Sequence, residues 1–134
     1  MENRRIKTTL LSFFALLLFT GLMSCKKDED VDSPPNKTSH KVVFKLEASA
    51  GSNLSVVAYG YDGQVTTASS LSGTAWTSPE VIVPAGTVVA TMSGSATGAN
   101  GTSSLKAQIY VDGQLKKEGT STGQALIANT SYSF

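Results

Sequence analysis

The sequence contains very few of the residues on which enzyme and metal chemistry usually depends. It has one cysteine, Cys25, and one histidine, His40, among 134 residues. A single cysteine excludes an intramolecular disulfide, and no His, Cys and carboxylate residues occur together at metal-ligand spacing. A nucleophilic triad needs a base that titrates near neutral pH, which leaves only His40, at the start of the domain. The sequence therefore predicts no enzyme, no cofactor and no metal site. The alternative, a cryptic hydrolase, would have to use His40 and Glu80.

The sequence also lacks an excess of charge of either sign. Arginine occurs only at Arg4 and Arg5, and from His40 onward five lysines balance five acidic residues. A neutral domain without arginine has little to gain from releasing the counterions of a nucleic acid. We therefore expect no nucleic-acid partner.

The first 24 residues follow the pattern of a secretory signal peptide. Arg4, Arg5 and Lys7 precede an apolar stretch of thirteen residues from Leu10 to Leu22. A helix of that length rises only about 20 Å, which is short of the roughly 30 Å hydrocarbon core of a bilayer. Residues 1–24 are therefore interpreted as a cleaved signal peptide rather than as a membrane-spanning helix.

Cys25 ends this leader in a sequence that resembles a bacterial lipobox. Leu22, a branched apolar residue, stands three positions before the cysteine, and the small residue Ser24 directly precedes it. The resemblance implies cleavage before Cys25, transfer of a diacylglyceryl group to its sulfur and acylation of the new amine. Each buried CH₂ contributes about 0.8 kcal/mol, so several acyl chains would anchor a small protein firmly in a membrane. The alternative is an incidental thiol in a plain signal sequence.

A charged tether follows the cysteine. Its first five residues are Lys26, Lys27, Asp28, Glu29 and Asp30. They resemble the export signal of Bacteroidota lipoproteins, which implies display on the outer face of the outer membrane. The alternative is a solvated charge run in a linker, with the domain facing the periplasm. Residues 25–39 also contain Pro34-Pro35 and lack apolar periodicity, so they are expected to be extended.

Residues 40–134 show short stretches in which apolar and polar residues alternate. Strands are expected at 41–47, 54–61, 64–68, in two short pieces within 76–83, and at 87–93, 105–111, 114–118 and 124–134. Asp62-Gly63 and Asp112-Gly113 predict two-residue hairpin turns, whereas residues 93–103 are rich in Gly, Ser and Thr and indicate a loop. No stretch of this region has helical periodicity. The pattern predicts one small all-β domain, an antiparallel immunoglobulin-like β-sandwich of about seven to nine short strands.

Two aromatic residues are candidates for a binding surface. Trp76 and Tyr110 lie in expected strands, and an exposed ring on a sheet can stack on a sugar or anchor a protein. For Trp76 the alternative is packing against the core. Tyr110 shares its face of the strand with Lys106 and Gln108, so we expect it to be partly exposed.

Three stretches of the domain resemble the extracytoplasmic part of MmpS-type membrane proteins. They are residues 55–64, the Trp76 segment that leads into 81–87, and residues 105–128. The resemblance implies a β-domain fold and an accessory role beside RND-type (MmpL-like) transporters that export lipids and siderophores. Members of that family are held by a transmembrane helix, whereas Cys25 implies acylation here. No functional residue carries over from the family.

Together these features predict a non-catalytic, lipid-anchored protein of the outer membrane that faces the cell surface. Its partners would be the membrane, through the lipid, and an envelope protein or glycan that the domain binds or scaffolds. The alternatives are an accessory subunit of an RND-type export system and the cryptic hydrolase. The oligomeric state is left open.

Overall fold

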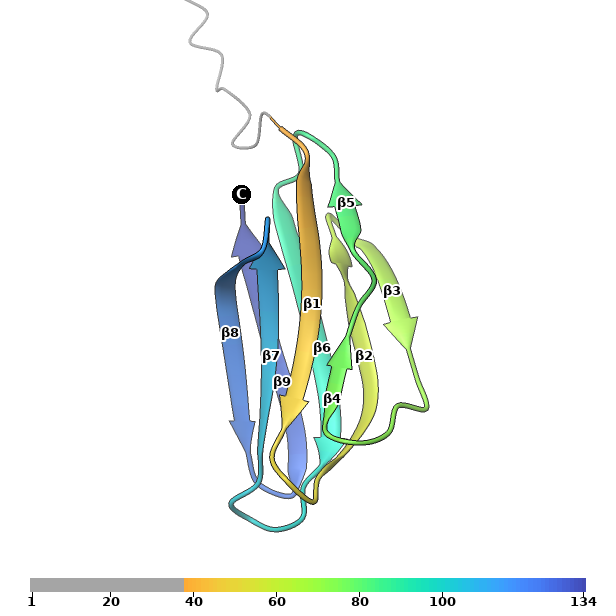
Figure 1. Ribbon diagram of the computed structural model, residues 1–134, viewed down its shortest axis with the longest axis vertical. Helices are drawn as coiled ribbons and strands as arrows, with labels where there is room; N and C mark the ends of the chain where they lie inside the picture. The colour runs from red at the N-terminus through yellow and green to blue at the C-terminus, as the bar shows by residue number, and fades with distance from the viewer. Residues whose placement is uncertain (1–37) are drawn as a thin grey trace, which may run out of the picture. The chain divides into compact units, whose positions relative to one another are not determined.

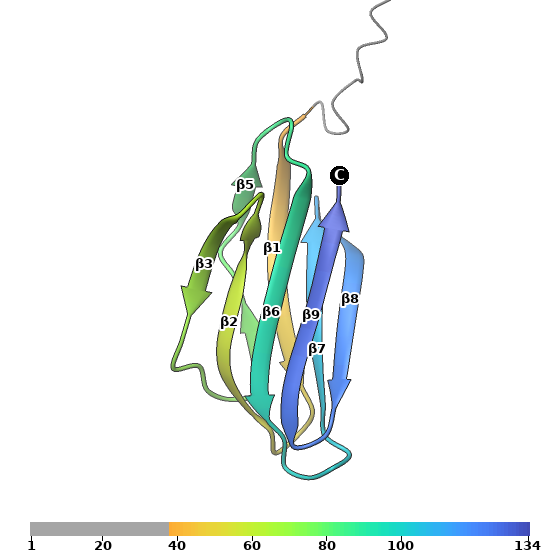
Figure 2. The same cartoon turned by 180° about the vertical axis from the view of Figure 1, so that it is seen from behind.

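Nine antiparallel strands build the part of the chain that the computed structural model describes, residues 38–134 (Figures 1 and 2). Their bounds are β1 (His40–Ala48), β2 (Asn53–Tyr61), β3 (Gln64–Ala68), β4 (Ala75–Thr77), β5 (Val81–Val83), β6 (Val89–Thr97), β7 (Ser104–Val111), β8 (Gln114–Thr122) and β9 (Ala125–Ser133). These residues contain no helix. The prediction of an all-β sandwich is confirmed.

The strands form two sheets that face each other. One sheet has the order β4-β1-β7-β8, with β5 also paired to β1, and the other has the order β3-β2-β6-β9. The hairpins β2–β3 and β7–β8 stay within one sheet, whereas the loops after β1, β3, β5, β6 and β8 cross to the other sheet. Strands that are adjacent in sequence therefore contribute to both layers of one core.

The core lies between the two sheets and is built by alternate residues of each strand. Its largest fully buried side chains include Phe44 and Leu46 of β1, Leu54 of β2, Met92 of β6 and Ile109 of β7. Burial of a side chain of this size stabilises a fold by roughly 1.5–3 kcal/mol. The expected apolar alternation in β1 and β7 is thus confirmed, and this packing holds the domain together without a disulfide.

Strand β6 is longer than the sequence indicates. It continues to Thr97, paired to β2 on one side and to β9 on the other, so the prediction of a loop at 93–103 is wrong for its first five residues. The reason is close packing between the sheets. A Cβ placed on Gly94 would lie 2.4 Å from Cδ2 of Leu46. Glycine at position 94 leaves room for a side chain of the opposite sheet.

Close packing also joins the sheets at β8 and β9. Strand β8 runs to Thr122, beyond the expected end at Glu118. A Cβ on Gly119 would lie 1.9 Å from the backbone oxygen of Asn129 in β9. Glycine at this position therefore allows the edges of the two sheets to approach each other. On the other side of the sandwich, the β3 edge and the short strands β4 and β5 are the margins (Figures 1 and 2).

Both predicted hairpin turns are present. In the β2–β3 turn, Asp62 and Gly63 have φ values of 44° and 80°, and in the β7–β8 turn Asp112 and Gly113 have values of 50° and 82°. Two successive residues with positive φ are typical of the type I′ turn, whose twist matches that of a β-hairpin. Asp tolerates this conformation better than most side chains, and Gly has no steric penalty there.

The two turns also attach each hairpin to the strand beside it in the same way. The Asp62 N–H donates to the Val89 oxygen at 3.0 Å, and the Val89 N–H donates back to Asp62 Oδ1 at 3.0 Å. The Asp112 N–H donates to the Lys41 oxygen at 2.8 Å, and the Lys41 N–H donates back to Asp112 Oδ1 at 3.0 Å. Each aspartate thus holds the first residues of a neighbouring strand, β6 or β1.

Candidate functional site

The charged residues of the strands all lie on one sheet. Strands β1, β7 and β8 carry them, whereas β2, β3, β6 and β9 contain none. Among residues 38–134, the three charged residues outside strands are Glu80, between β4 and β5, and the turn residues Asp62 and Asp112. We call the sheet of β4, β5, β1, β7 and β8 the charged sheet, and the sheet of β3, β2, β6 and β9 the uncharged sheet. The two outer faces of the sandwich therefore offer different chemistry.

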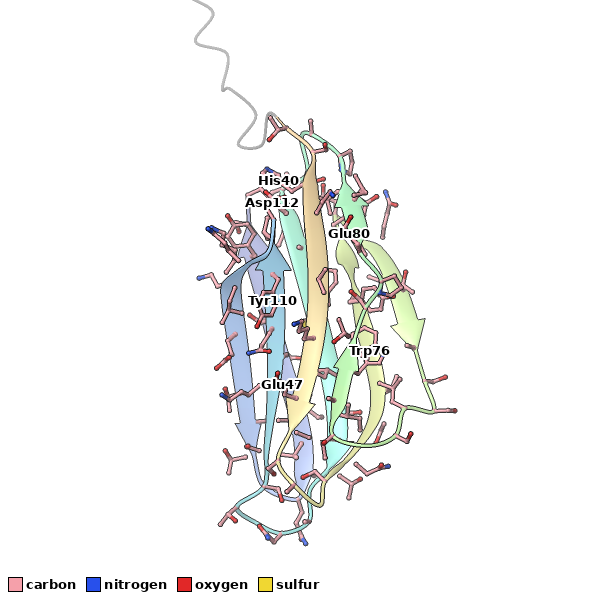
Figure 3. The ribbon with its side chains drawn as sticks, in the orientation of Figure 1. His40, Glu47, Trp76, Glu80, Tyr110 and Asp112 are labelled. Carbon is pink, nitrogen blue, oxygen red and sulfur yellow. The ribbon has the colours of Figure 1, made fainter. Side chains whose placement is uncertain are left out.

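The outer face of the charged sheet has an aromatic ring beside a lysine. Tyr110 of β7 lies opposite Val43 of β1, and the Nζ of Lys45 lies 4.5 Å from the centroid of the Tyr110 ring. A cation at this distance is attracted by the negative face of the ring. Tyr110 is half-buried, as the sequence predicts. It stands over the middle of the sheet rather than in a loop (Figure 3).

Gln108, next to this ring along the same face, is the unexpected residue of the surface. It stands between Lys45 of β1 and Glu118 of β8, yet only 6% of it is exposed. Its Nε2 donates to Glu118 Oε2 at 2.8 Å, and its Oε1 is buried with no hydrogen-bond partner. Leaving a buried acceptor unpaired costs about 1–3 kcal/mol. The unpaired Gln108 oxygen therefore lowers the stability of the domain, and it lies at the centre of the outer face of the charged sheet.

Charged groups of both signs surround this glutamine. Glu118 also lies 3.9 Å from the Nζ of Lys106, and Glu47 lies opposite Lys106 in the strand register. We call the surface formed by these residues the Tyr110 face: Lys45, Glu47, Lys106, Gln108, Tyr110 and Glu118. Two lysines and two glutamates give it no net charge. It offers an aromatic ring and charged donors and acceptors within three neighbouring strands, around the buried, unpaired acceptor of Gln108.

Trp76 lies on the other side of the same sheet. It is opposite Leu46, whose side chain is in the core, and its ring lies 5.2 Å from that of Tyr59 at an interplanar angle of 53°. Trp76 is half-buried and packs against the core, which is the alternative that the sequence left open. Trp76 and Tyr110 therefore do not form one surface (Figure 3).

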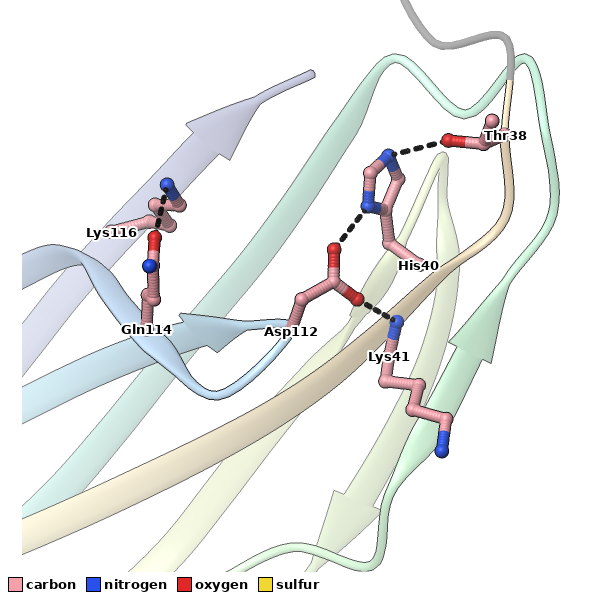
Figure 4. Close-up of polar contacts among 6 residues, drawn as sticks. All are labelled: Thr38, His40, Lys41, Asp112, Gln114 and Lys116. Atoms are coloured by element: carbon pink, nitrogen blue, oxygen red, sulfur yellow. Dashed lines mark hydrogen bonds and ion pairs between the residues drawn. The ribbon is translucent and has the colours of Figure 1, made fainter.

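His40 and Asp112 form a second polar cluster, at the end of the sandwich where the chain enters β1 (Figure 4). The Nδ1 of His40 lies 2.6 Å from Asp112 Oδ2, and the Oγ1 of Thr38 lies 3.4 Å from His40 Nε2. The His40 ring stacks on Phe134, with 5.3 Å between centroids. Hydroxyl, imidazole and carboxylate thus follow one another in the order of a catalytic triad.

The surroundings of this cluster are those of a structural contact. The Asp112 side chain is 53% exposed, whereas the aspartate of a catalytic triad is buried against its histidine. The hydrogen bond from the Lys41 backbone, and then that from the His40 side chain, hold the pKa of Asp112 below its usual value of 3.8. Both carboxylate oxygens hold β1 in place. Glu80 lies apart from this contact, paired with the Nζ of Lys41 at 3.5 Å.

Sequence reasoning missed both the buried amide of Gln108 and the pairing of His40 with Asp112. Gln108 alternates with apolar residues as an exposed residue would, and the residues opposite it, Lys45 of β1 and Glu118 of β8, come from distant parts of the chain. His40 and Asp112 are 72 residues apart, and the β1–β7 pairing alone brings them together. No local pattern could have indicated either.

Several predicted features lie outside the described residues: Cys25, Lys26, Lys27, Asp28, Glu29 and Asp30. Within residues 38–134, no three His, Cys, Asp or Glu side chains gather as a metal ion would require. The same range has no helix with the length and apolarity to cross a bilayer. In comparisons with known proteins, no family model and no curated protein matches this chain.

Proposed function

We propose that this protein is a non-catalytic binding module of the cell envelope. Acyl chains on Cys25 would hold it in the outer membrane, and residues 26–39 would lift the domain from the membrane on the outer side of the cell. The lipobox-like leader and the charged tether support this address. The proposal assigns recognition, rather than chemistry, to the folded domain.

The observation that carries the binding role is the unpaired acceptor of Gln108 beside Tyr110. An aromatic ring next to amide, carboxylate and ammonium groups suits a ligand that bears many hydroxyl groups and both donates and accepts hydrogen bonds. Because the lysines and glutamates of the Tyr110 face balance, a polyanion gains no net attraction there. We therefore propose an envelope glycan of low charge as the ligand. A hydroxyl of such a glycan would donate to Gln108 Oε1 after a small movement of the covering side chains.

The ligand proposal is tested by binding of the detergent-solubilised, full-length lipoprotein to immobilised envelope polysaccharides. Tyr110→Ala should weaken binding at least tenfold. The matched control is Ile127→Ala, which removes an apolar side chain that is 63% exposed on the uncharged sheet and should leave binding unchanged. Equal binding by the parent and the Tyr110 variant would refute the Tyr110 face as the site. Failure of the parent protein to bind any of the polysaccharides would refute the ligand class.

The address is tested by protease treatment of intact cells followed by detection of the domain. A surface-displayed domain should be degraded without lysis, and replacing Lys26 to Asp30 by a neutral sequence should protect it. Protection of the parent domain together with fractionation in the inner membrane would contradict the address. That result would favour the transporter-accessory role instead.

A further inference from the structure

The edges of the two sheets are not equally protected. β8 carries Lys116, Lys117 and Glu118, and its pairing with β7 is irregular at Ile109/Tyr110. β4 and β5 have three residues each and Pro79 lies between them. Short strands, charges, prolines and irregular pairing are the usual means by which natural sheets prevent an edge from pairing with another chain. In the uncharged sheet, β9 lies against β8 at Gly119.

β3 has none of these protections. Its five residues, Gln64–Ala68, include no charge and no proline, and all five pair with β2 in regular register. It forms the margin of the uncharged sheet in both views of the fold (Figures 1 and 2). Among the described residues, β3 is therefore the edge that is most open to a further strand.

The hairpin turn determines which backbone groups of β3 face outward. In a hairpin with a two-residue loop, the residues that flank the loop, here Tyr61 and Gln64, exchange hydrogen bonds, and the pattern then alternates. The N–H and C=O groups of Val65 and Thr67 therefore point away from β2. The side chains of these two residues lie on the outer face of the uncharged sheet, where Val65 is 55% exposed.

We propose that two copies of this protein associate through β3 in an antiparallel pair about a two-fold axis at Thr66. In this register Val65 lies opposite Thr67 of the other copy at two equivalent places, and each pair exchanges the backbone hydrogen bonds that β3 leaves unused. The two four-stranded sheets join into one sheet of eight strands. The contact is isologous, since the same residues serve both copies.

The chemistry of the edge favours a second copy over a foreign strand. Neither β3 nor the rest of the uncharged sheet places a charge at the contact, so two copies meet without like-charge repulsion and without burying an ion. The short sequence on each side of Thr66 is also self-complementary in shape, because Val and Thr are both β-branched and nearly equal in size. An uncharged edge offers a foreign strand no electrostatic selectivity.

Cysteine cross-linking of the full-length lipoprotein tests the register. In the proposed dimer the two Thr66 Cα atoms are about 4.5 Å apart, within the range of a disulfide. Thr66→Cys should give a covalent dimer on mild oxidation. Gln64→Cys is the matched control on the same face of β3, because the two copies of residue 64 would be about 14 Å apart. The parent chain, whose only cysteine is Cys25, controls for cross-linking at the leader.

Selective cross-linking at residue 66 would support the proposal. Equal cross-linking at residues 64 and 66, or none at residue 66, would overturn it.

A second measurement guards against a cysteine variant that folds poorly. In sedimentation of the solubilised protein, the parent should be dimeric, and Val65→Lys, which adds a charge at the edge, should be monomeric and should still unfold in one cooperative transition. Ile127→Lys adds the same charge on the same sheet away from the edge and should remain dimeric. A monomeric parent, or a Val65 variant that stays dimeric, would overturn the proposal. Val65 is on the other sheet from the Tyr110 face, so glycan binding should not change.

Discussion

The contact of Gly94 with Leu46 predicts a measurable coupling between the two sheets. A Cβ on Gly94 would lie 2.4 Å and 2.5 Å from the two δ carbons of Leu46, which is fully buried. Carbon atoms in optimal contact are about 3.5–4.0 Å apart, so Gly94→Ala introduces an overlap of more than about 1 Å. Overpacking of this kind should reduce the free energy of unfolding by about 1–3 kcal/mol.

Removing the opposing side chain should relieve this overlap. Leu46→Ala alone leaves a cavity and should destabilise the domain by about 2–5 kcal/mol. In the double variant, the new methyl group of residue 94 enters the space that the leucine vacates. The two effects should therefore be less than additive, with a coupling free energy of about 1 kcal/mol or more, within the range known for residues in contact.

Urea denaturation of the four proteins, followed by intrinsic fluorescence, measures this cycle. Gly101→Ala is the control, because a Cβ there meets no atom within 4 Å and should change stability little. If the Gly94 and Leu46 effects add without coupling, the two residues do not share one space. That outcome would show that Leu46 is not the reason for a glycine at position 94 of β6.

Three further predictions concern other parts of the molecule. The folded pKa of Asp112 is below 3.8, so its charge stabilises the fold above about pH 4 and this contribution disappears as the pH falls through the folded pKa. Asparagine also tolerates positive φ, so Asp112→Asn tests the charge without adding strain in the turn. Its melting temperature should be lower than that of the parent at pH 7, and this difference should disappear towards pH 2. A difference that does not change with pH would contradict this linkage. Gln108→Leu removes the unpaired oxygen, so the melting temperature should stay the same or rise, and glycan binding should become weaker. A large loss of stability would show that the amide has a structural role. Cys25→Ser should abolish labelling with palmitate and release the protein from membranes, and retained label would place the lipid elsewhere.

Much of the fold follows from short-range patterns in the sequence. The alternation of apolar residues in β1 and β7 and the two Asp-Gly turns predict their strands and hairpins because these features depend on neighbours along the chain. The error in β6 has a different origin. Gly94 and the serines around it are typical of a loop when seen alone, and only the Leu46 side chain from the other sheet explains the glycine.

The candidate site was less accessible to sequence reasoning. The exposure of Tyr110 could be predicted from its polar neighbours, but which aromatic residues share a face depends on strand register. The pairing of β4 with β1 places Trp76 opposite Leu46 and so directs it inward. The burial of Gln108 likewise requires β1 and β8 to flank β7. Long-range pairing of this kind leaves no local signature.

The attachment of the β7–β8 turn to β1 has a mechanical consequence. Residue 40 begins β1, so a force applied through the preceding chain reaches the domain at its first residues. There Asp112 binds both the N–H and the C=O of Lys41 and also the His40 ring. The same residues also pair with β5, His40 opposite Val83 and Lys41 opposite Ile82, so a pull on the preceding chain would load the turn contacts and this pairing together. The turn and β5 together would set how much drag the domain withstands before β1 begins to peel away.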